Sequence, residues 1–239
     1  MKRAVAFLTP LGRASAPNAT TLAWFPVVGA LIGFAVGGLW WLAAKAWLAL
    51  IAGAIAVACD LALTGLLHFD GLADAGDGLL APLTRERRLE AMADPSIGAF
   101  GALTVGVVLL LRFGAFASLR PSPLAIAGLW CASRTGMVAI TELLPYARPE
   151  GIVKSFLSTR SAFHHRALQG SIVAGIALSA AFVIVSRGAR GLAALGAELI
   201  AIALVALFSR RQLGGYTGDV LGAAGVIGET IGLLALAVR

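Results

Sequence analysis

The stretch "LAWFPVVGALIGFAVGGLWWLAA", residues 22–44, contains no charged side chain. A helix needs about 20 mainly apolar residues to cross the hydrocarbon core of a bilayer, and this run is long enough. The next apolar run, residues 47–67, follows after only Lys45 and its neighbours. The two runs therefore predict a tight hairpin of membrane helices.

The overall composition also indicates a membrane protein. Of the 239 residues, 59% are hydrophobic and only 13% are charged, whereas a typical soluble domain is about 25% charged. Five further runs are long enough to span a bilayer: residues 99–119, 123–144, 168–186, 191–209 and 219–238. The sequence predicts one all-α domain over residues 1–239, a polytopic integral membrane helical bundle of about seven transmembrane helices.

Small residues inside these runs are expected to serve packing. Gly29, Gly33 and Gly37 recur at four-residue spacing, which lets two helices approach closely in lipid. Cys59 and Cys131 lie alone within apolar runs, without the spacing of a metal or redox motif. We interpret both cysteines as small buried hydrophobic residues.

The basic residues predict an orientation. The net charge is +7 without a dense basic block, which favours topology signals and lipid contacts over nucleic-acid binding. With residues 1–20 as a retained cytoplasmic N-terminus, twelve of the nineteen basic residues fall in cytoplasmic segments and five on the opposite side. The polar segments 68–78, 145–167 and 210–219 then share the cytoplasmic side, where we expect them to form one site.

The segment "HFDGLADAGDG", residues 68–78, concentrates negative charge next to an apolar run. Asp70, Asp74 and Asp77 have i, i+4, i+7 spacing, which places them on one face of a helix, within about 60° of one another. Three carboxylates there repel each other unless a cation lies among them, and such oxygen ligands suit Mg²⁺, Mn²⁺ or Ca²⁺. The alternative is a solvated helix end outside the bilayer.

A second acidic signal is Asp219 in "LGGYTGDVLGA". Its position predicts the start of the last helix, where a negative side chain is favoured. Asp219 is therefore either a plain N-cap or a fourth metal ligand beside the 68–78 cluster. The neighbouring Gly218 allows a ligand to approach the backbone closely.

Several basic residues and one histidine are further candidates. Arg85 and Arg88 recur at helical spacing with apolar residues, which predicts a short interfacial helix whose arginines bind either phosphate or lipid head groups. Arg134 lies within an apolar run, so it either pairs with Glu198 or holds a diphosphate in a deep pocket. His68 is either a general base or an ordinary interfacial residue.

The order of these motifs resembles a known family. "HFDGLADAGDG", "LEAMADPSIGAFG", "SRT", "YARPEG" and "LGGYTGDVLGA" are similar to signatures of the adenosylcobinamide-GDP ribazoletransferases, also called cobalamin synthases. The resemblance spans nearly the whole chain. By motif it assigns site roles to His68, Asp70, Asp74, Asp77, Asp94, Ser133, Arg134, Arg148, Thr217 and Asp219. The sequence departs from the family pattern at Pro95, where a serine is usual.

The resemblance implies an enzyme of late vitamin B12 synthesis in the bacterial plasma membrane, with its active site facing the cytoplasm. Such enzymes join adenosylcobinamide-GDP to α-ribazole or its 5′-phosphate and release GMP, with Mg²⁺ as the expected cofactor. The expected partners are these small molecules and membrane lipid, with self-association left open.

Combined with the residue patterns, the resemblance gives a hypothesis for the site. Metal ligands are expected at Asp70, Asp74, Asp77, Asp219 and Asp94, and catalytic groups at Asp74, Asp77 and His68. Substrate phosphate is expected to contact Arg134, Ser133, Arg148, Arg88, Thr217 and Gly218. The alternatives are an enzyme like the CDP-alcohol phosphotransferases and, from a different class, a cation transporter.

Overall fold

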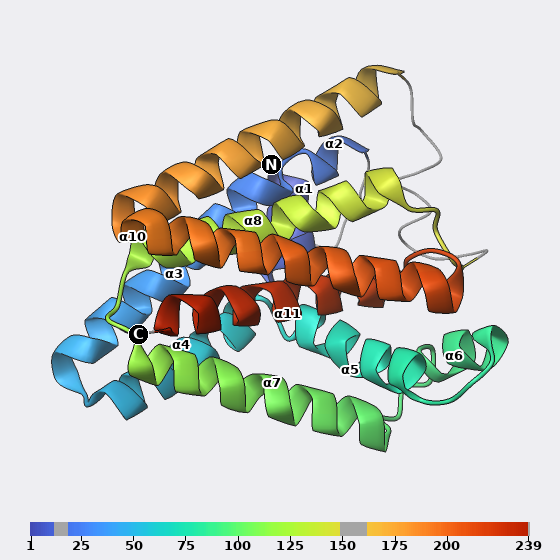
Figure 1. Ribbon diagram of the computed structural model, residues 1–239, viewed down its shortest axis with the longest axis horizontal. Coiled ribbons are helices and arrows are strands. Elements are labelled where there is room, and N and C mark those ends of the chain that lie inside the picture. Colours follow the sequence, from blue (N-terminus) through green and yellow to red (C-terminus); the bar gives the residue numbers. More distant parts are fainter. Residues whose placement is uncertain (12–18, 149–161, 239) are drawn as a thin grey trace.

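The computed structural model describes residues 1–11, 19–148 and 162–238, and this part of the chain is almost entirely helical. Figure 1 shows the long helices packed side by side as one bundle. The elements are α1 (Lys2–Leu8), α2 (Ala19–Leu22), α3 (Phe25–Ala46), α4 (Ala49–Leu63), α5 (Leu67–Leu80), α6 (Arg85–Ala91), α7 (Ala99–Ser118), α8 (Pro123–Leu143), α10 (Ala162–Leu213) and α11 (Gly218–Ala237). The all-α prediction is confirmed.

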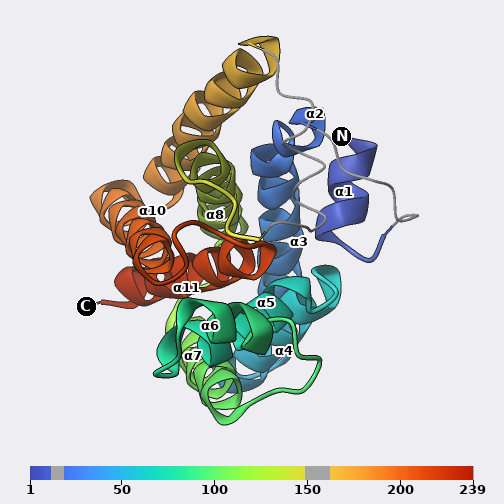
Figure 2. The same ribbon diagram turned by 90° about the vertical axis from the view of Figure 1, so that its right-hand side faces the viewer.

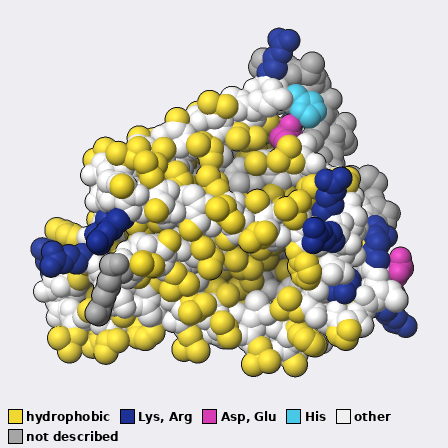
Figure 3. All heavy atoms as spheres, viewed as in Figure 1, with side chains coloured by type: hydrophobic (Ala, Val, Ile, Leu, Met, Phe, Trp, Pro, Cys, Tyr) yellow, Lys and Arg dark blue, Asp and Glu magenta, His cyan; other side chains and the backbone are white. Residues whose placement is uncertain are grey.

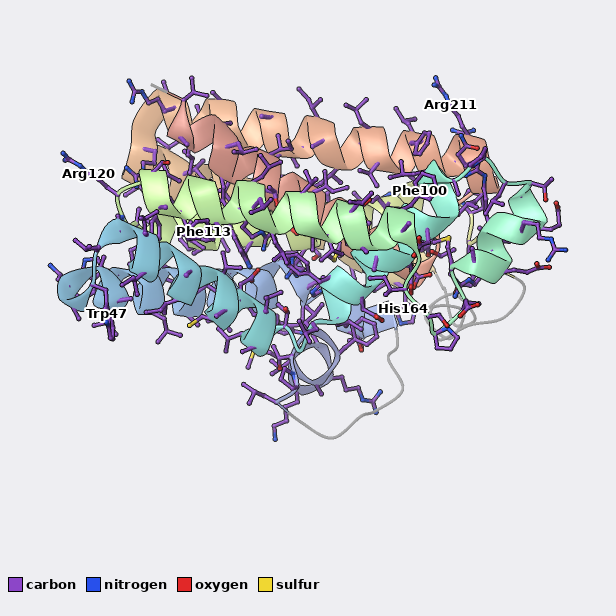
Figure 4. All side chains as sticks on the ribbon, turned by 90° about the horizontal axis from the view of Figure 1, so that it is seen from below. Trp47, Phe100, Phe113, Arg120, His164 and Arg211 are labelled. Carbon is purple, nitrogen blue, oxygen red and sulfur yellow. The ribbon has the colours of Figure 1, made fainter. Side chains whose placement is uncertain are left out.

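The described helices are suited to a multi-pass membrane protein. Five of them are long and apolar enough to cross a bilayer, or six if the bent pair α4 and α5 counts as one span, so this criterion does not confirm the predicted number of seven. Figure 3 shows a broad hydrophobic surface between two ends where the charged side chains gather. Arg120 and Arg211 lie at opposite ends of the bundle in Figure 4, as the predicted orientation requires. Arg13, Lys154, Arg160 and Arg239, four of the residues on which that orientation rests, lie outside the described residues.

Two of the predicted runs lie in α10. Its backbone breaks at Gly188, where φ is 58° and ψ is −136°, a left-handed conformation that glycine adopts without steric cost. Figure 1 shows the chain reversing direction there, so that runs 168–186 and 191–209 lie on the two sides of the break. The break lies in the short gap that the sequence left between the two predicted runs.

The helix predicted over residues 47–67 ends earlier than expected. Helix α4 ends at Leu63, and α5 starts at Leu67 at an angle of 90° to it. Gly65 and Leu66 between the helices have φ values of 57° and 62°. Leucine in this left-handed region is strained, since its Cβ crowds the backbone. The bend directs the acidic helix α5 against α7 and α11.

The predicted glycine contact is confirmed between α3 and α8. A Cβ built on Gly29 would lie 2.5 Å from the Trp130 carbonyl oxygen, and one on Gly33 would lie 2.6 Å from that of Ile126. A Cβ on Gly37 would lie 2.7 Å from the Cα of Pro123. No side chain fits these three positions, so the glycines allow the two backbones to touch.

An ionic network holds the centre of the bundle together. Arg112 of α7 pairs with Asp60 of α4 and with Glu229 of α11, and Glu229 also pairs with Arg134 of α8. The Trp130 indole donates a hydrogen bond of 2.8 Å to Asp60. All five side chains are buried. Charges in an apolar interior need such partners, because an unpaired charge there is costly.

The network corrects one interpretation of Arg134. The partner offered for it was Glu198 of α10, but the guanidinium pairs with Glu229. Glu198 is fully buried, and its two carboxylate oxygens have no hydrogen-bond partner among the described residues. Helix α11 lies at the centre of the bundle, in contact with α5, α7, α8 and α10 (Figure 2), and so its one glutamate serves two arginines.

Candidate functional site

A cavity of about 350 Å³ lies among α1, α2, α3, α5, α8 and α11. Its polar lining includes His68 and Asp70 from α5, Asp219 from α11, and Arg148 from the loop after α8. Ligand pockets in proteins commonly measure about 300–1,000 Å³. The predicted convergence of the three polar segments is therefore confirmed for their described residues.

Close packing of α5 on α11 brings the acidic residues together. A Cβ on Gly71 would lie 3.0 Å from the Cα of Asp219, and a Cβ on Gly222 would lie 3.2 Å from the His68 carbonyl oxygen. Any side chain at these glycines would push the two helices apart. The glycines thus set the distance between Asp70, which flanks Gly71, and Asp219.

A short backbone pairing positions Arg148. The Ala147 amide donates to the Tyr216 carbonyl at 2.8 Å, and the Tyr216 amide donates to the Pro145 carbonyl at 2.9 Å. This pairing joins the loop after α8 to the turn before α11. A Cβ on Gly215 would lie 2.1 Å from the Pro145 oxygen, so only glycine permits the pairing.

Arg148 then reaches the first turn of α11. Its Nη2 donates to Oδ2 of Asp219 at 2.9 Å and to the Met92 carbonyl at 3.1 Å. The side chains of Arg148 and Asp219 are 25% and 21% exposed, so the pair is accessible from the cavity. The sequence named both residues but did not predict that they form an ion pair.

Asp219 lies in the first turn of α11, as predicted, but it is not the N-cap. The cap is Thr217, whose hydroxyl accepts a hydrogen bond from the Val220 amide at 3.3 Å. The same hydroxyl donates to Oδ2 of Asp219 at 3.2 Å. Gly218 lines the cavity and Thr217 does not. The carboxylate of Asp219 therefore remains available to a ligand, next to the positive end of the helix dipole.

The three aspartates of α5 have different surroundings. Asp70 lines the cavity. Asp74 is half-buried, and the like charges of Asp219, Asp70 and Asp77 act on its carboxylate together with the opposite charge of Arg148. Negative charge is thus concentrated between α5 and α11, which is the condition under which a cation is attracted.

Asp77 is engaged with the start of α7. Its two carboxylate oxygens accept hydrogen bonds from the Gly98 amide at 2.7 Å and from the Gly101 amide at 2.9 Å. These amides belong to the first turn of a helix, whose N–H groups have no partner within the helix itself. The structure therefore gives Asp77 a capping role that sequence reasoning missed.

Asp94 lies in the loop between α6 and α7 and does not line the cavity. Its exposed carboxylate accepts a hydrogen bond of 2.8 Å from the Ser96 amide. This hydrogen bond lowers the pKa of Asp94 below its ordinary value. The structure does not place Asp94 with Asp70 and Asp219.

The arginines of α6 make structural contacts. Arg88 is buried and its Nη1 donates to the carbonyls of Gly78 and Leu79 at 2.8 and 2.7 Å. It thereby satisfies the C-terminal end of α5, where carbonyls have no helical partner. Arg85 donates to the Leu213 carbonyl at 2.8 Å and so fixes the end of α10. Neither arginine lines the cavity.

Ser133 and Arg134 also lie away from the cavity lining. Both are buried in α8, where Arg134 donates to the Ser133 hydroxyl at 2.7 Å and pairs with Glu229. Met137 and Thr141, further along α8, line the cavity instead. The geometry supports a role for Arg134 in the central network, and a phosphate contact stays a prediction.

His68 and Tyr146 add two polar groups to the cavity lining. His68 is buried, and its Nδ1 has no hydrogen-bond partner among the described residues. This nitrogen is therefore not engaged in a hydrogen bond that holds the fold together. Burial raises the pKa of the Tyr146 phenol, with a smaller opposing effect of Arg148, so that Tyr146 stays a neutral hydrogen-bond donor.

Carboxylates alone do not complete a metal site. In the part of the chain that the structure describes, no three His, Cys, Asp or Glu side chains are close enough to one another to hold a metal ion. A hard cation such as Mg²⁺ commonly takes only one or two protein carboxylates and completes its shell with substrate phosphate and water. The donor chemistry of Asp70, Asp74 and Asp219 fits such a shared site.

Sequence reasoning missed several residues that the structure makes important. Asp60 and Arg112 join Glu229 and Arg134 in the central network, and their charge within apolar runs was the signal that could have identified them. His165 lies in α10, with its Nδ1 2.6 Å from Glu142. Phe7 and Phe25 line the cavity, and no pattern in the sequence indicated this.

Comparisons with known proteins agree with the family resemblance. The family model described as cobalamin-5-phosphate synthase matches residues 1–237. An adenosylcobinamide-GDP ribazoletransferase of Citrobacter koseri is 38% identical over 217 residues, covering 89% of this chain and 85% of that protein. An adenosylcobinamide-GDP ribazoletransferase of Escherichia coli is 36% identical over 217 residues, with the same coverage of the two chains. No solved structure matches the chain. The chain belongs to the cobalamin-5-phosphate synthase family.

Proposed function

We propose that this chain joins adenosylcobinamide-GDP to α-ribazole, or to its 5′-phosphate, and releases GMP. The observation that carries the proposal is the cavity in which Asp70, Asp219 and Arg148 meet, in a chain of this family. Carboxylates and a guanidinium around one cavity suit phosphoryl chemistry, which depends mainly on positioning and charge neutralisation.

The expected reaction is a substitution at phosphorus. The 3′-oxygen of the ribose forms a bond to the phosphorus that carries the cobinamide, and the bond from that phosphorus to the GMP oxygen breaks. We assign the binding of phosphate oxygens to Arg148, and its position beside Asp219 on the cavity supports this role. His68 or a carboxylate of α5 accepts the proton of the attacking hydroxyl, and GMP leaves with the displaced oxygen.

We also propose that the reaction requires Mg²⁺, held by one or two carboxylates drawn from Asp70, Asp74 and Asp219 together with substrate phosphate and water. When bound, the ion would neutralise phosphate charge as it develops on the leaving group. The concentration of negative charge around Asp74 supports this assignment. Asp77 is a less suitable ligand, since both of its oxygens accept backbone hydrogen bonds.

The proposed location is the bacterial plasma membrane with the cavity facing the cytoplasm. The support is the excess of lysine and arginine in the segments on the side of α6 and the start of α11. Cysteine-labelling at Arg211 and at Arg120, which lie at opposite ends, would test it: a membrane-impermeant thiol reagent on intact cells should label Arg120→Cys alone. Both variants should be made in a background where Cys59 and Cys131 are replaced by alanine.

A single assay tests the activity and its metal requirement. Purified protein in lipid nanodiscs would receive adenosylcobinamide-GDP, α-ribazole and Mg²⁺, and GMP release would be measured. We expect GMP release from the wild type, its loss with a chelator, and its recovery when Mg²⁺ is added back. Asp74→Ala should abolish release while the protein stays folded.

The matched control is Glu86→Gln, which removes an exposed carboxylate of α6. This variant should keep wild-type turnover. Near-normal turnover of Asp74→Ala would refute the proposed metal site, and no GMP release from the wild type would refute the proposed reaction.

A further inference from the structure

The cavity has two chemically different walls. Asp70, Asp219 and Arg148 line one part of it. Helices α1, α2 and α3 line another part with hydrocarbon side chains only: Phe7, Leu8, Leu22 and Phe25. The central ionic network and Glu198 are buried in the core and do not line the cavity. The proposed reaction assigns roles to the polar side of the cavity, and it leaves the apolar wall without a role.

The apolar wall contains an aromatic pair. The rings of Phe7 and Phe25 are stacked with centroids 5.8 Å apart and an interplanar angle of 25°. Phe25 is only 2% exposed, so its position is fixed by the surrounding bundle. Flat aromatic ligands gain from stacking on such rings. The wall is therefore suited to a flat bicyclic ring.

The polarity of the wall discriminates between the two flat rings that the proposed reaction brings. Guanine presents several donors and acceptors along its edges, and leaving them unpaired against hydrocarbon is costly. A benzimidazole, the base of ribazole, has one ring nitrogen free and otherwise apolar edges. The corrin ring carries many polar amide side chains, which an apolar wall would leave unpaired.

We infer that the wall of Phe7, Leu8, Leu22 and Phe25 binds the apolar base of the ribazole nucleoside, with its ribose directed toward Asp70 and Asp219. This inference rests on the proposed function. It makes α1 a specificity element of the site. The diphosphate of the other substrate then approaches the nucleoside from the side of Arg148.

Steady-state kinetics with each substrate varied in turn tests the inference. Phe7→Ala and Phe25→Ala should each raise KM for α-ribazole roughly tenfold, the loss expected for one base–aromatic stack. Neither change should alter KM for adenosylcobinamide-GDP by more than about twofold. Phe7→Leu keeps the apolar volume and removes the π face, so it should raise KM for α-ribazole by an intermediate factor.

A binding measurement complements the kinetics. Titration calorimetry of α-ribazole into the nanodisc protein, without the second substrate, should show the same loss of affinity in Phe7→Ala. GMP titrated into the same samples should bind wild type and variant equally. The matched control is Phe34→Ala, which removes one ring of another aromatic pair, with Phe182 at 5.5 Å, away from the cavity lining.

Three outcomes would overturn the inference. One is an unchanged KM for α-ribazole in folded Phe7→Ala and Phe25→Ala. Another is an equal rise in Phe34→Ala, which would indicate a general packing effect. The third is a rise in KM for adenosylcobinamide-GDP with weaker GMP binding, which would place guanine on the wall. Each of these requires a wild type that releases GMP, whereas an inactive wild type would refute the proposed function itself.

Discussion

Arg148 donates a hydrogen bond from Nη2 to Oδ2 of Asp219 at 2.9 Å and thereby joins the loop after α8 to the first turn of α11. The two residues are 71 positions apart in the sequence. Their contact depends on the backbone pairing of Ala147 with Tyr216 and on the absence of a side chain at Gly215. The ion pair is thus a product of the turn geometry.

Because the pair is partly exposed, Arg148→Ala should affect turnover more than stability. A partly solvated ion pair contributes at most about 1 kcal/mol to the free energy of unfolding. We expect a change in Tm of no more than a few degrees, and a fall in kcat/KM for adenosylcobinamide-GDP of roughly tenfold or more from loss of the phosphate contact. Arg211→Ala, an exposed arginine at the same end, should match wild type in both measurements.

Asp77 should act first as a helix cap. Asp77→Ala removes the acceptors of the Gly98 and Gly101 amides, and loss of a cap costs about 0.5–2 kcal/mol. Asp77→Asn retains one acceptor oxygen and should lose less stability. Thermal unfolding monitored by circular dichroism would rank the three proteins, and an unchanged Tm in Asp77→Ala would argue against the capping role.

Two buried glutamates should respond in opposite ways to substitution. Glu229→Gln leaves Arg112 and Arg134 without their shared carboxylate, and breaking a buried ion pair costs about 3–5 kcal/mol. Glu198→Gln removes a carboxylate that has no hydrogen-bond partner among the described residues, so stability should be maintained or increased. Tm values in the same detergent would compare them, and equal losses in both variants would contradict the network as described.

Arg88 and Arg87 are neighbours on α6, and alanine variants of the two can be compared directly. Arg88→Ala leaves the carbonyls of Gly78 and Leu79 without their buried donor, which should cost about 1–3 kcal/mol. Arg87→Ala breaks only an exposed pair with Glu90 and should change stability by less than about 0.5 kcal/mol. A raised KM for adenosylcobinamide-GDP in Arg88→Ala without a fall in Tm would instead support the phosphate-binding role predicted from the sequence.

The class of fold follows from the amino-acid composition and the length of the apolar runs. Long apolar runs can satisfy their backbone hydrogen bonds in lipid only as helices, so composition and run length were sufficient to predict an all-α membrane bundle. The glycines at positions 29, 33 and 37 predicted a close helix contact, and α3 and α8 make it. The acidic segment 68–78 and the turn before Asp219 were likewise recognisable as parts of one site.

The contacts of each residue in that site depend on how the helices pack, which the sequence patterns did not predict. Asp70 and Asp77 lie on the same face of α5, but seven residues separate them by about 10 Å along the helix axis. Over that distance the neighbouring element changes, so Asp70 faces the cavity and Asp77 caps α7. The sequence patterns also did not predict the bend at Gly65 and Leu66 or the ion pair of Arg134 with Glu229. Helical spacing shows which residues share a face of a helix, but it does not show which other helix packs against that face.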